Sequence, residues 1–64
     1  MKVRDLIKSL EQAGWKLDRV RGSHRQYRHP EKPELRTVTV AGHPAEDVPK
    51  GTLNVILKQA GLKE

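Results

Sequence analysis

The sequence contains no cysteine and only two aromatic residues, one tryptophan and one tyrosine. Without cysteine, the chain can form neither disulfide bonds nor thiolate metal sites. Two aromatic side chains are too few for a surface on which successive nucleic-acid bases stack, and both occur where we expect core residues. These absences exclude disulfide scaffolds and zinc-thiolate modules, and they disfavour a platform for single-stranded bases.

Long apolar runs are also missing. No stretch approaches the ~20 apolar residues that a membrane-spanning helix needs, and the polar, periodic N-terminal segment lacks the pattern of a signal peptide. We therefore expect no membrane partner and a cytoplasmic location. A chain of 64 residues predicts one domain over residues 1–64, with a core too thin to enclose a deep substrate cavity. A surface site for a large ligand suits such a chain better.

Positive charge is the most pronounced feature that is present. The chain has thirteen basic and eight acidic residues and a formal net charge of +5, as is common in proteins that bind nucleic acid or another polyanion. The charge is concentrated in residues 16–28, where Asp18 is the only acid. The cations of this segment are Lys16, Arg19, Arg21, Arg25 and Arg28.

The basic segment is centred on a turn at Gly22 and Ser23. Glycine adopts positive φ without steric cost, and serine readily bonds neighbouring backbone groups, so the pair is typical of a turn. Runs of alternating character over residues 15–20 and 24–29 flank the turn and predict a β-hairpin. His24 is then the first residue of the second strand.

Apolar stripes with helical spacing lie towards both ends of the chain. They predict one helix over about residues 2–13 and another that begins at Pro49 and ends before Gly61. The stripes consist of Val3, Leu6, Ile7, Leu10 and Ala13 in the first helix and of Leu53, Ile56, Leu57 and Ala60 in the second. The β-branched alternation of residues 36–40 predicts a third strand, with its two valines directed inward.

The order helix, strand, strand, strand, helix predicts an α+β fold. The economical arrangement is a three-stranded antiparallel sheet with both helices on one face and the other face open to solvent. In the first strand, alternation alone groups Trp15 with Leu17 on one face and Lys16 with Asp18 on the other.

The second strand has Tyr27 as its natural core residue. Alternation then directs His24, Gln26 and Arg28 away from the core. Arg25 shares the inner face with Tyr27, so its charge must extend to water at an edge of the sheet.

His24 is the leading candidate for chemistry. Cleavage of RNA through its own 2′-hydroxyl needs a base for that proton and an acid for the leaving 5′-oxygen, and a histidine can serve in either role near neutral pH. Cations offset the charge that develops on the phosphorus centre. The candidate phosphate ligands are Arg21, Arg25, Arg28, Lys16 and Arg19. The alternative is a histidine that merely begins a strand.

The three histidines also raise the question of a metal site. His24 and His29 are five residues apart on one strand and therefore point to opposite faces, so we expect no metal and no other cofactor. We interpret His43, in a Gly-His-Pro loop, as a structural residue or a substrate contact. A second proton-transfer group is not identified, and Gln26 and His29 both remain open for that role.

Several spaced motifs together resemble the HicA toxin family over nearly the whole chain. They are Gly22-Ser23-His24 with an aromatic at Tyr27, Val38 to His43, Val48-Pro49-Lys50-Gly51-Thr52-Leu53, and Ile56-Leu57-Lys58-Gln59-Ala60-Gly61-Leu62. The resemblance implies a fold like that of double-stranded-RNA-binding domains and an mRNA interferase activity in a type II toxin–antitoxin system. It also implies that His24 is catalytic, that no metal is required, and that a cognate HicB antitoxin covers this region.

The resulting hypothesis is a toxin ribonuclease with RNA and a HicB-type antitoxin as its partners. His24 is the general acid or base, and Gly22 and Ser23 shape the turn. The first alternative is a non-catalytic RNA-binding module, which would bind RNA in a salt-dependent manner without cleaving it. The second is a protein-interaction domain whose basic face meets an acidic partner.

Overall fold

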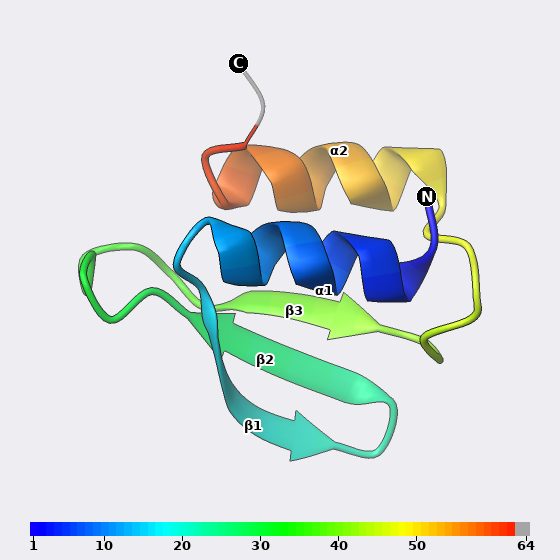
Figure 1. Cartoon of the computed structure of the whole chain (residues 1–64), viewed down its shortest axis with the longest axis horizontal. Helices are drawn as coiled ribbons and strands as arrows, with labels where there is room; N and C mark the ends of the chain where they lie inside the picture. The colour runs from blue at the N-terminus through cyan, green and yellow to red at the C-terminus, as the bar shows by residue number, and fades with distance from the viewer. Residues whose placement is uncertain (63–64) are drawn as a thin grey trace.

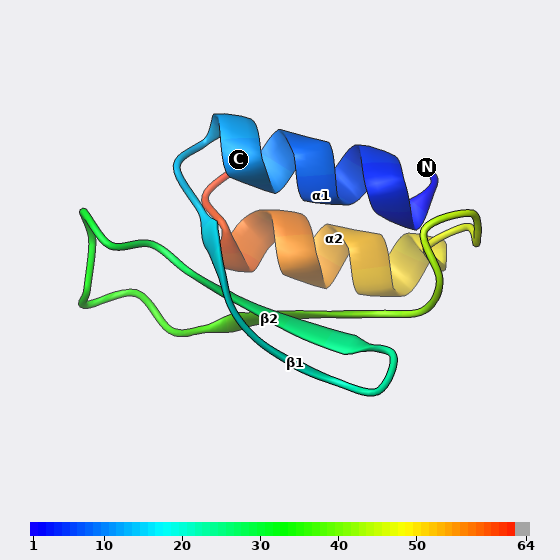
Figure 2. The ribbon, with the colours of Figure 1, turned by 60° about the horizontal axis from the view of Figure 1, so that its bottom comes forward.

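The five expected elements are present in the expected order. The computed structural model describes residues 1–62 and contains helices α1 (Val3–Gln12) and α2 (Lys50–Gln59) and strands β1 (Lys16–Arg21), β2 (His24–Arg28) and β3 (Val38–Ala41). The strands form one antiparallel sheet in the order β1-β2-β3, and both helices lie on the same side of it (Figure 1, Figure 2). The predicted α+β fold is confirmed.

Element boundaries differ from the predictions by one or two residues, because contacts between distant segments of the chain decide where each element ends. β3 begins at Val38 instead of residue 36, where its pairing with Tyr27 starts. β1 extends to Arg21, which pairs with the first residue of β2. Pro49 is the N-cap of α2 with an extended ψ of 140°, so the helix itself begins one residue later than predicted.

The core lies between the helices and one face of the sheet. The predicted stripes supply half of its buried residues, whereas Ile7, Ala13, Leu53 and Leu57 are only partly buried at its margin. The most deeply buried large side chains are Trp15, Leu6, Leu10, Val3, Val38 and Val40. Burial of apolar surface of this kind is the main favourable term in folding. Within residues 1–62, neither helix has the length and apolar character needed to cross a bilayer.

The end of α1 directs Trp15 into this core. Gly14 has a φ of +99°, and the amides of Gly14 and Trp15 donate to the carbonyls of Glu11 and Leu10 at 3.1 and 3.0 Å. These two bonds form a Schellman motif, which stops the helix and satisfies its last carbonyls. The indole Nε1 of Trp15 then donates to the carbonyl of Ala60 at 3.4 Å, so the C-terminal ends of both helices are joined.

His29 is a core residue. Its ring is buried and lies edge-on to Trp15, with the ring centres 5.4 Å apart. Nε2 lies 2.9 Å from the carbonyl oxygen of Ala13; because a carbonyl only accepts, Nε2 carries the proton and donates it. A Cβ atom added to Gly14 would lie 2.7 Å from this nitrogen. His29 therefore fastens the end of β2 to the end of α1 and takes no part in a surface site.

β1 does not contribute to the core as alternation suggested. All six of its residues are exposed, and Leu17 has 51% of its surface accessible although it was grouped with the buried Trp15. Both helices pack most closely against β3, and Figure 1 shows β1 as the strand farthest from them. The apolar position at Leu17 thus lies on the helix side of the sheet but beyond the reach of the helices.

Candidate nucleic-acid interface

The side of the sheet turned away from the helices carries most of the predicted site, and we call it the basic face. His24 opens β2 on this face and is exposed. Its neighbours across the sheet are Arg21 on β1 and Ala41 on β3. Side chains of directly paired residues lie on the same face and close together, so Arg21 stands beside the imidazole while the small Ala41 leaves room on the other side.

The turn before His24 has the predicted residues. Because Arg21 pairs with His24, the loop between the strands contains only Gly22 and Ser23. Gly22 has a φ of +58° and is the only turn residue with positive φ, as in the type II′ turns that favour glycine at the first loop position. A Cβ atom at Gly22 would meet nothing within 4 Å, so the turn is open on the outside.

Two further rows of paired residues extend the basic face along the sheet. Arg19, Gln26 and Thr39 form the second row, and Lys16 and Arg28 form the third. Four of the five predicted phosphate ligands therefore share the face of His24. Gln26 lies at the centre of the array and is half-buried, whereas the cations around it are exposed.

A β-bulge makes this grouping possible. The pairing shifts by one residue between Leu17 and Arg19, so Asp18 has no partner of its own in the register. Strict alternation would have separated Lys16 from Arg19 and Arg21, and the extra residue returns all three to one face. Sequence reasoning missed the bulge, because no glycine or proline marks it. The carboxylate of Asp18 lies 3.5 Å from Nε of Arg28, in a pair that is open to solvent and therefore weak.

Arg25 lies on the opposite side of the sheet from His24, as alternation predicted. It pairs with the buried Val40, and its Nη1 donates to the carbonyl of Gly42 at 3.2 Å. The guanidinium therefore reaches the edge of the sheet and holds the chain that follows β3. The structure does not bring Arg25 together with the four cations of the basic face.

The loop after β3 lies at the same end of the sheet as the hairpin turn (Figure 1). The amide of Gly42 donates to the carbonyl of Ser23 at 3.1 Å, which ties the loop to the residue before His24. His43 follows on this loop and is exposed. The site thus has one histidine on the sheet and a second one on the adjacent loop, while His29 is withdrawn into the core.

The aromatic residues lie away from the basic face. Trp15 and Tyr27, the only aromatics of the chain, are both buried among the core residues. Burial raises the pKa of the Tyr27 hydroxyl above its usual value, the carboxylate of Glu11 adds to this effect, and the Arg25 guanidinium opposes it. The basic face therefore presents charges and hydrogen-bonding groups to a ligand, and neither Trp15 nor Tyr27 offers a ring there on which a base could stack.

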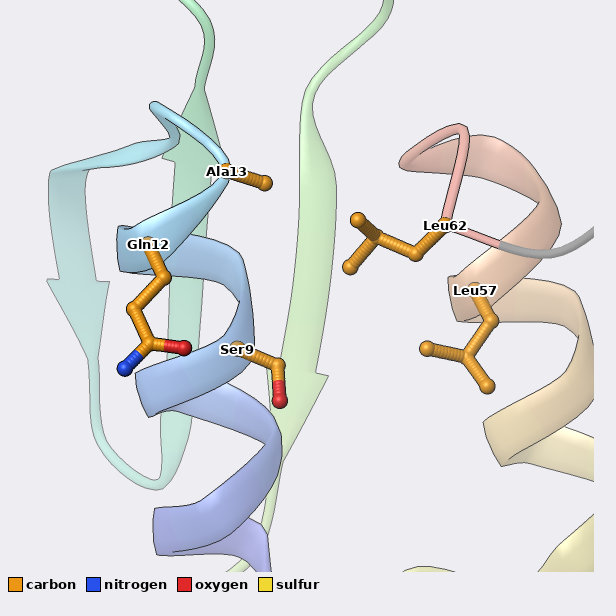
Figure 3. Close-up of a pocket in the computed structure, with 5 residues that line it drawn as sticks. All are labelled: Ser9, Gln12, Ala13, Leu57 and Leu62. Atoms are coloured by element: carbon orange, nitrogen blue, oxygen red, sulfur yellow. The ribbon is translucent and has the colours of Figure 1, made fainter.

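Two other possible sites do not coincide with the basic face. In the part of the chain that the structure describes, no three His, Asp or Glu side chains gather closely enough to hold a metal ion. A hollow of about 410 Å³ opens between the C-terminal ends of the helices (Figure 3). None of the predicted site residues belongs to its lining, which consists of Ser9, Gln12, Ala13, Leu57 and Leu62.

Comparison with protein-family models gives one match, over residues 3–62, to the model described as the HicA toxin of bacterial toxin–antitoxin systems. The matched region includes both helices, the whole sheet and every residue of the basic face. No curated protein matches the sequence.

Proposed function

Because the chain belongs to the HicA toxin family of bacterial toxin–antitoxin systems, we propose that it is a metal-independent endoribonuclease that cleaves mRNA in the cytoplasm with His24 as its catalytic group. An antitoxin partner follows from the family, and we assign it to the HicB type. The observation that supports the proposal is the strand register, which pairs one exposed histidine with Arg21 and puts three further cations on the same open face.

The proposed reaction uses the 2′-hydroxyl of the RNA as the nucleophile. His24 accepts the proton of this hydroxyl as the 2′-oxygen attacks phosphorus, and the bond from phosphorus to the 5′-oxygen breaks. The products are a 2′,3′-cyclic phosphate on one fragment and a 5′-hydroxyl on the other. Arg21 is the nearest cation across the strand and stabilises the negative charge that builds on the phosphate oxygens in the transition state.

The remaining cations of the basic face hold the backbone of the RNA. Arg19, Lys16 and Arg28 lie further from His24 along the strands. Arg21 and Arg19 are two residues apart on one face of β1, which corresponds to about 6.6 Å along a strand. This spacing is close to the separation of neighbouring phosphates in an extended strand. Arg25, on the helix side, positions the loop after β3 and does not contact phosphate.

The 5′-oxygen needs a proton as it leaves. His29 cannot supply it, because its ring is buried and its Nε2 is bonded to the carbonyl of Ala13. Gln26 lies on the basic face, but its amide is neutral and does not titrate, so it can form hydrogen bonds without supplying a proton. The proposal therefore leaves His43 and solvent water as sources of this proton.

Product analysis tests the reaction directly. A single-stranded RNA is compared with the same sequence carrying a single 2′-deoxy nucleotide at the mapped cleavage position. We expect cleavage of the RNA, a 2′,3′-cyclic phosphate product, and protection at the deoxy position. Binding of RNA without cleavage would favour the non-catalytic module, and cleavage at the deoxy position would overturn the role of the 2′-hydroxyl.

A further inference from the structure

The helix side of β1 is an apolar surface that nothing in the described chain covers. Leu17 pairs with Tyr27 and Val20 pairs with Arg25, so both apolar side chains of β1 lie on the core face of the sheet. Tyr27 is buried under the helices, whereas Leu17 and Val20 have 51% and 52% of their surfaces accessible. The two side chains therefore extend the apolar face of the sheet by one strand, beyond the part that the two helices cover.

We infer that this surface, Leu17 and Val20 together with the free edge of β1, is the docking site of the antitoxin. The inference rests on the family assignment, which requires an antitoxin, and not on the ribonuclease mechanism. The partner segment that fits has apolar side chains that cover Leu17 and Val20 and carboxylates that reach around the edge of the sheet.

Charge complementarity sets the chemistry of that segment. The other face of β1 carries Lys16, Arg19 and Arg21. A partner that binds along the free edge of β1 therefore contacts cations on one face of the strand and apolar groups on the other. An apolar centre with a polar, charged rim is the usual composition of a protein interface. Carboxylates placed on Arg19 and Arg21 would also occupy the phosphate positions beside His24.

The same charges argue against a second copy of this chain as the occupant. Pairing β1 with β1 of another molecule would bring together the cations of both strands, and like charges across paired strands are destabilising. RNA fits no better, because aliphatic side chains offer a phosphate backbone neither charge nor hydrogen bonds. A protein segment that carries both apolar side chains and carboxylates is the occupant that matches the apolar face and the cationic face of β1.

The test separates antitoxin binding from RNA cleavage. The double variant Leu17→Ser/Val20→Ser is compared with wild type and with Leu35→Ser/Val55→Ser, which makes the same two substitutions at positions 37% and 55% exposed, outside β1. Titration calorimetry measures affinity for the purified cognate antitoxin, circular dichroism checks the fold, and a separate assay measures RNA binding and cleavage without antitoxin.

We expect the β1 variant to bind the antitoxin at least tenfold more weakly, to retain RNA binding and cleavage within twofold of wild type, and to remain active when antitoxin is added. The control variant should match wild type in every assay. Antitoxin affinity that is unchanged, or weakened equally in both variants, would overturn the inference. RNA binding lost in the β1 variant would assign the surface to nucleic acid instead. If wild type fails to cleave RNA, the proposed activity fails while the calorimetric comparison still decides this inference.

Discussion

The salt dependence of RNA binding reports how many cations the basic face presents to phosphates. The register places four on that face, namely Lys16, Arg19, Arg21 and Arg28. For a single strand, the logarithm of the binding constant falls with a slope of about −0.7 per neutralised phosphate, so four contacts predict a slope of about −2.8. Replacing Arg21 by Gln should make the slope shallower by about 0.7 and weaken binding.

The matched variant is Arg25→Gln. This variant removes the same charge from the same hairpin. In wild type, however, the Arg25 guanidinium lies on the helix side and donates to the carbonyl of Gly42, so we expect the salt-dependence slope of RNA binding to stay at its original value. Fluorescence anisotropy with a labelled single-stranded RNA measures both slopes, in a His24→Ala background that keeps the RNA intact. Equal changes in the two variants would refute the assignment of faces on which the site depends.

Two further predictions concern stability. Gly14→Ala should destabilise the fold by about 2–4 kcal/mol, because alanine is strained at this positive φ and its Cβ would collide with the ring of His29. Gly22→Ala carries only the strain of its positive φ and should cost about 1–2 kcal/mol. Urea unfolding of both variants measures the two losses of stability, and equal losses would contradict the prediction. Burial in the folded state raises the pKa of Tyr27. The stability that the neutral Tyr27 hydroxyl contributes is therefore fully present below pH ~10 and is lost as the pH rises through the pKa of the folded state. Tyr27→Phe should therefore lose less stability than wild type between pH 8 and strongly alkaline pH, and parallel losses would contradict the raised pKa.

The elements of the fold could be predicted from the sequence because their signals are local. The apolar stripe around Leu6 and Leu10, the glycine that follows α2 and the Gly-Ser turn each act within a few residues, and each one lies where the sequence predicts it. The inward direction of Arg25 also followed from simple alternation around Tyr27.

The details of the site depended on contacts between distant segments. The bulge at Asp18 exists only in the pairing of β1 with β2, and it decides that Lys16, Arg19 and Arg21 share one face. The burial of His29 depends on its meeting the end of α1, which no strand pattern encodes. The exposure of Leu17 reflects where the helices stop, and alternation alone says nothing about that.

The central claim is that His24 cleaves RNA without a metal ion, and one comparison tests it most directly. Wild type and His24→Gln, which replaces the imidazole by a polar group that cannot titrate, are incubated with single-stranded RNA in excess EDTA after circular dichroism has shown equal folding. We expect cleavage by wild type, and RNA binding without cleavage by His24→Gln. Cleavage by the variant at the wild-type rate, or no cleavage by wild type until a divalent metal is supplied, would contradict it.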